Sequence, residues 1–234
     1  MNSNFEDIIS VSLNDKKLVS AEQLRAGDVI LCYKGKKIDV IGRRIQKVTG
    51  SSYTHAAIYL SSGKAAESKI CGVKTTDIYQ LVNRYMHVAI FRQPLWNSNR
   101  VKRLELFVEE LLSKGAKYNS YGVLKFGHQR NIFEQTIFND LNAFFEGKLI
   151  PPSPKKKHYF CSELVVDCFI YTGIIQPSAA VVYRSNVTSP GALGKDPTFG
   201  YFYGYLSCIE NYQIPETDEF FDETTFNEIF GDEK

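Results

Sequence analysis

The sequence predicts a mixed α+β domain, because strand-like and helix-like patterns occur along one chain of 234 residues. Residues 53–60 and 64–68 form two short strand-like runs on either side of a Ser-Ser-Gly turn, as in a β-hairpin. Residues 100–114 and 161–172 carry apolar side chains at the i, i+3, i+4 spacing of helices that bury one face. With 44% apolar residues, the chain is long enough to bury a full core as one domain.

The hairpin carries the first pair of reactive side chains. His55 begins its first strand and Glu67 lies on the return strand. With a three-residue turn, position 57 pairs with position 67, which makes His55 and Glu67 diagonal neighbours, roughly 7 Å apart between backbones. A turn one residue longer or shorter would send Glu67 to the opposite face. Taken alone, a histidine at this place is more often structural.

The helix over residues 161–172 begins with a cysteine and ends at Gly173. A thiol at a helix N-terminus faces N–H groups without intrahelical acceptors and the positive end of the helix dipole, and both favour the thiolate. Cys161 is therefore a candidate nucleophile, with a cysteine that only packs as the alternative. His55 as its base and Glu67 as the group that orients the imidazole would complete the chemistry.

Four segments resemble the permuted NlpC/P60 group of papain-like thiol enzymes, in particular its YiiX-like branch. They are Gly27–Leu31, Tyr53–Ile58 followed by Glu67, Phe160–Val165 and Ser189–Leu193. Ordinary NlpC/P60 enzymes have the cysteine first, whereas the permuted group and this chain have the order histidine, polar residue, cysteine. Such sites depend on geometry rather than chain order. The more distant lecithin:retinol acyltransferase branch carries a second histidine where Glu67 stands.

The resemblance implies a circularly permuted papain-like fold, in which an antiparallel, barrel-like sheet packs on the nucleophile helix. It implies that Cys161 attacks a carbonyl, His55 moves the proton and Glu67 holds the imidazole, while N–H groups at the helix start stabilise the oxyanion. Tyr53 and Tyr159 are expected to form walls of the cleft. The catalytic domain is expected to span residues 1–215. We expect no cofactor, and the scattered Cys and His residues indicate no metal site.

The composition indicates which cell compartment the protein occupies and whether a segment could span a membrane. The five cysteines are odd in number and lack the paired spacing of zinc or disulfide frameworks, which favours reduced thiols. No apolar stretch approaches the 18 residues of a membrane span. The first seven residues have neither basic side chains nor an apolar run, so we expect no secretory signal and a cytoplasmic protein. Export as an effector by a route without a signal is the alternative.

Charge is unevenly distributed along the chain. Residues 216–234 form an acidic C-terminal tail of net charge −7, while the other residues carry +9, for the total of +2. The tail keeps several phenylalanines, which would allow it to dock on the domain or on a partner. A frayed acidic tail is the alternative and the slightly favoured interpretation. Residues 36–48 combine an apolar stripe with basic faces, which fits a membrane-surface helix or, preferably, an ordinary domain helix. No pattern typical of nucleic-acid binding is present.

A second basic cluster, Lys155–His158, precedes Cys161. It either lowers the pKa of the thiol and attracts an anionic substrate, or forms a solvated loop, which is the favoured interpretation. His87, His128 and His158 lack an acid at a comparable spacing and are interpreted as structural.

The region around residues 100–150 is expected to be a helical insertion. Its first helix carries Val101, Leu104, Val108 and Leu111 on one face. Its second part, residues 128–150, carries several phenylalanines and isoleucines at helical spacing. We expect that face to belong to the core, with a lid or a lipid-facing groove as the alternative.

The resemblance implies hydrolysis of an amide in a peptide-like substrate, because NlpC/P60 relatives typically cut amide bonds in cell-wall peptides. A lipid acyl ester or thioester, cleaved or transferred by the same three residues, is the runner-up, since both reactions pass through an acyl-thioenzyme. A papain-like module that only binds a ligand or a partner is the third hypothesis. Finding Cys161 buried and remote from His55 would favour the binding module.

Overall fold

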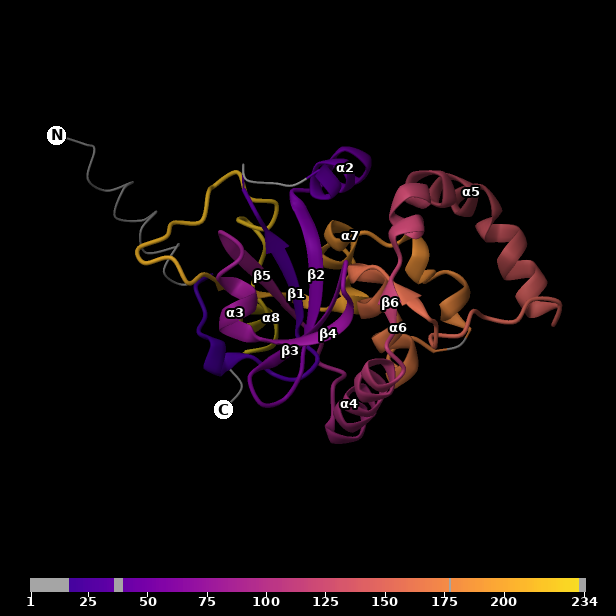
Figure 1. Ribbon diagram of the computed structural model, residues 1–234, viewed down its shortest axis with the longest axis horizontal. Coiled ribbons are helices and arrows are strands. Elements are labelled where there is room, and N and C mark those ends of the chain that lie inside the picture. Colours follow the sequence, from indigo (N-terminus) through magenta and orange to yellow (C-terminus); the bar gives the residue numbers. More distant parts are fainter. Residues whose placement is uncertain (1–16, 36–39, 177, 232–234) are drawn as a thin grey trace.

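The computed structural model describes residues 17–35, 40–176 and 178–231 of the protein. The expected α+β class is confirmed, with a six-stranded sheet in the order β4-β3-β2-β1-β5-β8 and every neighbouring pair antiparallel (Figure 1). The strands are β1 (Val29–Tyr33), β2 (Tyr53–Tyr59), β3 (Lys64–Lys69), β4 (Gly72–Asp77), β5 (His87–Arg92) and β8 (Tyr201–Leu206).

The expectation of a barrel-like sheet is wrong for the part of the chain that the structure describes. β4 and β8 are the two edges of the sheet, and they do not pair with each other. Each edge is covered by a different segment: β4 packs against the short parallel pair β6 (Lys117–Tyr118) and β7 (His158–Tyr159), and β8 is bridged by Leu18. Covering an edge removes the need to close the sheet on itself.

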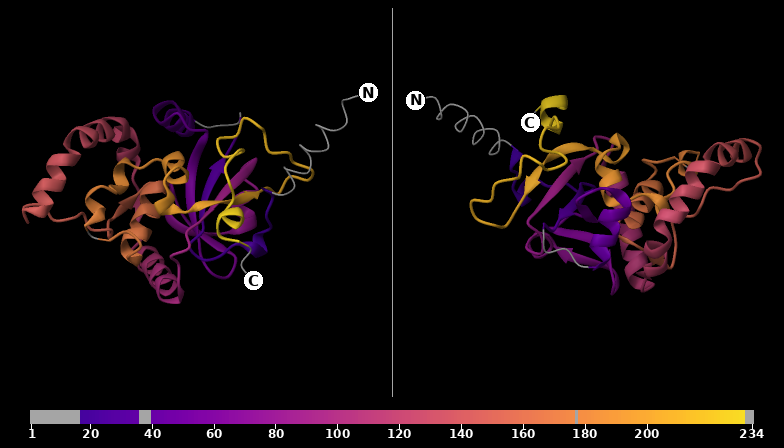
Figure 2. Two further views of the ribbon diagram at one scale, coloured as in Figure 1. Left: turned by 180° about the vertical axis from the view of Figure 1, so that it is seen from behind. Right: turned by 90° about the horizontal axis from the view of Figure 1, so that it is seen from above.

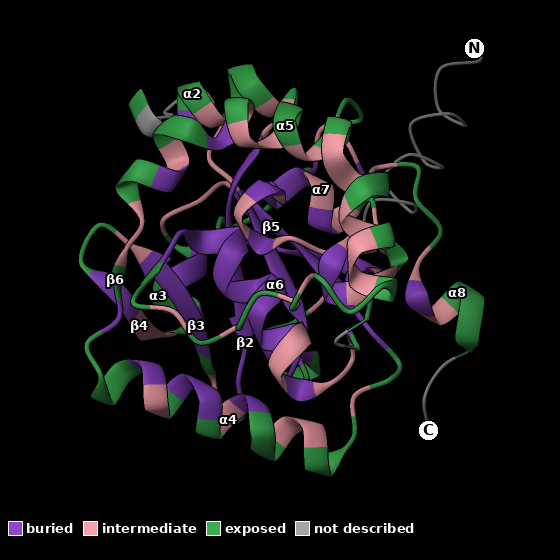
Figure 3. Ribbon diagram, turned by 90° about the vertical axis from the view of Figure 1, so that its right-hand side faces the viewer, coloured by how far each residue is buried: buried purple, intermediate pink, exposed green. Residues whose placement is uncertain are grey.

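One helix is central to the packing. α6 (Cys161–Thr172) follows the predicted bounds and ends at Gly173, whose left-handed φ of 79° a glycine adopts without strain. It lies against β2 on one side and against α4 (Ser98–Ser113) on the other. Figure 3 shows α6 and the strands buried between more exposed helices. The first turn of α6, where Cys161 lies, is therefore enclosed by the core.

Two apolar clusters stabilise the sheet, one on each face. The larger joins the sheet to α6 and α4, and the predicted face of α4 contributes Leu104, Val108 and Leu111 to it. The smaller cluster packs the other face against η1 (Ala21–Gln23), α3 (Ile78–Val82) and α8 (Phe226–Phe230). The remaining short helices are η2 (Ala179–Val181), η3 (Ser185–Val187), α7 (Pro190–Gly194) and η4 (Pro197–Phe199).

The second part of the insertion differs from the expected core helix. α5 (Ser120–Phe145) extends away from the sheet and packs mainly on η2 and η3 (Figures 1 and 2). Phe138 and Phe145 are 77% and 78% exposed, because these two short helices cover only one side of α5. In the described residues, no helix combines the length and the apolar character needed to cross a bilayer.

The acidic C-terminal segment is docked rather than frayed over its described residues. Phe220 and Phe226 are buried, and α8 lies against β8. The Asp218 carboxylate accepts hydrogen bonds from the hydroxyls of Tyr53 and Tyr205 and pairs with His87 at 3.0 Å. Apolar residues of the tail and the Asp218 carboxylate thus both hold the segment against the rest of the domain.

Candidate active site

Cys161 and His55 come together where the start of α6 meets β2. Cys161 is the first residue of α6 and His55 is the third residue of β2, and both residues line the same cavity. Both residues are buried, with 4% and 9% of their surface exposed. The arrangement contradicts the separation of thiol and imidazole that a binding-only module would show.

The imidazole of His55 contacts the carboxylate of Glu67. The Nε2 atom of His55 lies 2.9 Å from Oε2 of Glu67, which leaves Nδ1 as the ring nitrogen for the thiol. The predicted register is confirmed, since Ala57 pairs with Glu67 and the turn closes with Leu60 N–H donating to Lys64 O at 2.7 Å. A diagonal pair on adjacent strands can touch only in this register.

Glu67 is fully buried and surrounded by donors that the sequence patterns did not reveal. The Thr76 hydroxyl donates to Oε1 at 2.6 Å, and the Arg84 guanidinium donates to both oxygens at 2.9 and 3.0 Å. Burial alone would raise the pKa of the Glu67 carboxyl, but the hydrogen bond and the charge of His55, with Thr76 and Arg84, hold it well below its usual range. Glu67 is therefore a fixed negative charge beside the imidazole.

The thiol and the imidazole shift each other toward an ion pair. Burial would raise the pKa of Cys161, but the hydrogen bond and charge of His55, with the backbone N–H groups of Ala56 and Ser162, lower it. Burial would lower the pKa of His55, but Cys161 and Glu67 raise it. A thiolate beside an imidazolium is the state in which a cysteine is nucleophilic and a histidine can act as an acid.

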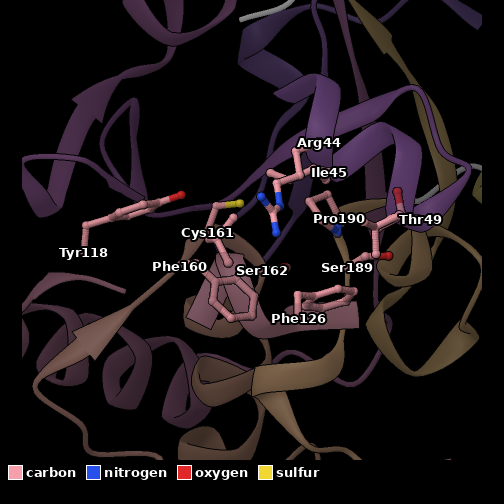
Figure 4. A pocket seen from close by; sticks show the side chains of 12 residues that line it. Arg44, Ile45, Thr49, Tyr118, Phe126, Phe160, Cys161, Ser162, Ser189 and Pro190 are labelled. Carbon is pink, nitrogen blue, oxygen red and sulfur yellow. The ribbon is translucent and has the colours of Figure 1, made fainter. Parts of the chain in front are cut away.

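Two cavities meet at Cys161. The first, which we call the apolar slot, runs between α2 (Val40–Thr49) and α5 and is lined mainly by Ile45, Val48, Val123, Phe126, Phe160 and Pro190. Figure 4 shows the sulfur of Cys161 within this slot, below Arg44 and Ile45. The second, the His55 cavity, is lined by His55, Thr54, Ser68, Lys34, Lys69 and Tyr85. Cys161, Ile45 and Tyr118 line both.

The segment Ser189–Leu193 helps to hold the slot in shape. Ser189 caps α7, and Ser189 and Pro190 line the slot. A Cβ atom added at Gly191 would lie 2.1 Å from the Ser51 Oγ, so only glycine allows this approach to the loop before β2. The Ser162 hydroxyl donates to Thr188 O at 2.7 Å and ties the same segment to α6.

The two tyrosines expected in the cleft walls lie in the core instead. Tyr53 is fully buried, and its hydroxyl contacts His87 and Asp218. A β-bulge between the Cys32–His55 and Tyr33–Tyr53 pairs shifts the alternation of β2, so Tyr53 joins the larger apolar cluster. Tyr159 is also fully buried, and its hydroxyl donates to Pro154 O at 2.8 Å.

The lysines that precede Cys161 interact with acids rather than with the thiol. Lys156 pairs with Glu163 and Asp167 of α6 at 2.9 and 2.8 Å, and Lys155 pairs with Glu110 at 2.7 Å. Their positive charges therefore pair with carboxylates of α4 and α6. Lys36 and Lys37 of the other basic cluster lie outside the described residues.

The remaining histidines occupy sites apart from Cys161. His87 is buried in the network with Asp218, and the side chains of His128 and His158 are exposed. In the described part of the chain, no three His, Cys, Asp or Glu side chains are grouped as a metal would require. The lining of the two cavities likewise offers no cluster of metal-ligating side chains.

Comparison with known proteins gives one relationship consistent with this geometry. The chain is 23% identical over 167 residues to the Escherichia coli protein named "probable lipoprotein peptidase YaeF". The two proteins are distant homologues. The match covers 67% of this chain and 59% of the length of YaeF. No family model matches the chain.

Proposed function

We propose that this protein is a cysteine hydrolase that uses Cys161 as the nucleophile, His55 as the acid–base group and Glu67 as the residue that orients the imidazole. The observation that carries the proposal is that Cys161 and His55 line one cavity, while Nε2 of His55 lies 2.9 Å from the buried Glu67 carboxylate. Cys161 is the first residue of α6, and it lines both cavities. The name of the distant homologue supports a peptidase-like activity.

The reaction proceeds in two steps on this geometry. The Cys161 thiolate attacks the substrate carbonyl carbon, and the first N–H groups of α6, which lack intrahelical acceptors, stabilise the oxyanion. The bond to the leaving nitrogen breaks as that nitrogen takes the proton from the His55 imidazolium. In the second step His55 removes a proton from water, hydroxide adds to the thioester, and the acid is released as Cys161 leaves as the thiolate.

The substrate proposed first is an amide of a peptide-like molecule. A protonated imidazole is needed most for an amine leaving group, and the raised pKa of His55 favours that protonated form. The runner-up is a lipid acyl ester or thioester, for which the apolar lining of the slot is the specific observation. The three residues would perform the same steps on either bond.

The first experiment is labelling with iodoacetamide, followed by intact mass and peptide mapping, on wild type, Cys161→Ala and His55→Ala. We expect one rapidly labelled site, absent from Cys161→Ala and slower in His55→Ala. Labelling of Cys161 no faster than of the exposed Cys208 would overturn the assignment of the nucleophile. Matched amide, ester and thioester substrates with one acyl group then identify the bond that is cleaved.

A further inference from the structure

The position of Cys161 between two chemically different cavities has a consequence for the direction in which a substrate binds. The thiol, Ile45 and Tyr118 border both cavities, whereas His55 lines only the second. A substrate whose carbonyl carbon sits at the thiol extends into both spaces. This inference rests on the proposed function, in which Cys161 is the nucleophile and His55 is the acid.

The slot is apolar over most of its wall. α2 contributes Ile45 and Val48, α5 contributes Val123 and Phe126, and the rings of Phe126 and Phe160 meet edge to face at 6.1 Å. The slot also has polar lining residues whose polar groups make hydrogen bonds within the protein: Arg44 donates to Leu124 O at 3.2 Å, Ser162 donates to Thr188 O, and Thr49 and Ser189 accept from backbone N–H groups. Such a surface gains free energy when apolar groups leave water and offers little to charged ones.

The His55 cavity is more polar than the slot, although Ile45, Ile70 and Tyr118 also line it. Its lining includes the hydroxyl-bearing Thr54 and Ser68 and the amines of Lys34 and Lys69, together with the imidazole. The imidazole stacks on the Tyr85 ring, with 6.0 Å between centroids and 9° between planes, which fixes the orientation of the proton donor. A polar group in this cavity finds hydrogen-bond partners, whereas the polar groups that line the slot already make hydrogen bonds within the protein.

The chemistry decides which part of the substrate enters which cavity. A general acid must come within hydrogen-bond reach of the leaving atom to protonate it. His55 reaches the second cavity only, so the leaving group must lie there. The acyl group, which stays on the sulfur after the first step, is then directed into the slot between α2 and α5.

We propose that the enzyme selects substrates with an apolar acyl group, held in the slot by Ile45, Val48, Val123 and Phe126, and a polar leaving group in the His55 cavity. The sequence patterns placed Val48 only on the apolar stripe of residues 36–48 and assigned no role to Val123. Two sources provide an apolar acyl group: a fatty acyl chain, or a peptide with a large apolar residue at the cleaved carbonyl. The chemistry that the slot recognises is common to both.

The test uses fluoromethyl ketones, which place a chosen group on the carbonyl and release fluoride as Cys161 Sγ bonds to the methylene carbon. The groups compared are methyl, heptyl, N-acetylphenylalanyl and carboxyethyl, with second-order rate constants measured by intact mass on the full chain. We expect the faster of heptyl and N-acetylphenylalanyl to exceed methyl by about tenfold or more, and carboxyethyl to be slowest. The faster of the two apolar groups identifies the source.

The variant Val48→Ser/Val123→Ser makes the slot more polar without touching the reacting residues. We expect it to reduce the advantage of the apolar group over methyl by about fivefold or more, with the methyl rate of the same variant as the internal reference. Val40→Ser is the matched control, because Val40 is also an exposed valine of α2 but does not line the slot.

Rates that do not depend on the acyl group, or that are highest for carboxyethyl, would overturn the proposal. An unchanged preference in the double variant would overturn the assignment to this slot. The iodoacetamide rate separates these failures from a failure of the proposed function, since a small electrophile needs only the activated thiolate and not the slot.

Discussion

His55 and Glu67 are twelve residues apart in the sequence, yet the imidazole Nε2 lies 2.9 Å from the carboxylate Oε2. The contact depends on a three-residue turn that sets the register of β2 and β3, and on Thr76 and Arg84, which hold the carboxylate from the other side. In the proposed mechanism, a negative charge fixed in this way stabilises the imidazolium that forms when the thiol loses its proton.

Replacing Glu67→Gln keeps the shape of the side chain and removes its charge. We expect kcat/KM to fall on the order of 100-fold, because the imidazolium loses its counter-charge and its orientation. Steady-state kinetics on the best substrate measures this change. The control is Lys74→Gln, which removes a half-exposed cation 3.8 Å from Glu67 and should leave kcat/KM within about threefold. Equal losses in the two variants would contradict the role of Glu67.

The lowered pKa of Cys161 predicts a pH dependence of labelling. Since the thiolate is the reactive form, iodoacetamide should reach half of its maximal rate at Cys161 at a lower pH than at Cys208, whose pKa is raised by partial burial. In His55→Ala the midpoint for Cys161 should move upward, because burial then acts on the thiol without the opposing imidazolium. Rates at each site are measured by peptide mapping. A midpoint insensitive to His55→Ala would show that the imidazole does not activate the thiol.

The buried pair of His87 and Asp218 predicts a pH dependence of stability. Burial would raise the pKa of Asp218, but hydrogen bonds from His87, Tyr205 and the Phe220 N–H lower it. Because the folded pKa is below the unfolded value of about 3.9, this carboxylate stabilises the fold above that pH and less as the pH falls toward the folded pKa. Asp218→Asn should therefore lower the free energy of unfolding by about 2 kcal/mol at pH 7.

Urea unfolding of wild type and Asp218→Asn between pH 7 and pH 3 measures this difference. The gap between the two proteins should narrow below about pH 4, where the wild-type carboxylate begins to lose its advantage. A gap that stays constant over that range would mean that the charge of Asp218 contributes nothing and that the loss comes only from hydrogen bonds that an amide nitrogen cannot accept.

The docked C-terminal segment predicts a large effect from a residue far from the candidate site in sequence. Phe220 is 1% exposed and packs its ring on Phe91 at 4.9 Å and on Tyr53 at 5.2 Å. Phe220→Ala should reduce the free energy of unfolding by about 3–5 kcal/mol, through the lost burial and the cavity left behind. Phe138→Ala, at an exposed position of α5, should change it by less than about 0.5 kcal/mol. If Phe220→Ala reduced the free energy of unfolding as little as Phe138→Ala does, the tail would lie outside the folding unit.

Several features followed directly from the pattern of residues. The period of apolar side chains fixed α4 and α6, and Gly173 fixed the end of α6 because glycine accepts a left-handed φ. The three-residue turn predicted the pairing of position 57 with position 67. These predictions succeeded because each depends on local geometry. The helix over 128–150 shows the limit, since its periodicity indicates an apolar face but not whether anything covers that face.

By itself the sequence determined the local elements: the helix that begins at Cys161, the hairpin that presents His55 and Glu67, and the α+β class. The tertiary structure alone decided what these elements meet. It left the sheet open, turned Tyr53 into the core through a bulge, docked Phe220 on the sheet, and brought α2 and α5 together beside the thiol. The physical reason is that helix and strand periods are set by neighbours in the chain, whereas edges, cavities and buried charges depend on packing between distant segments.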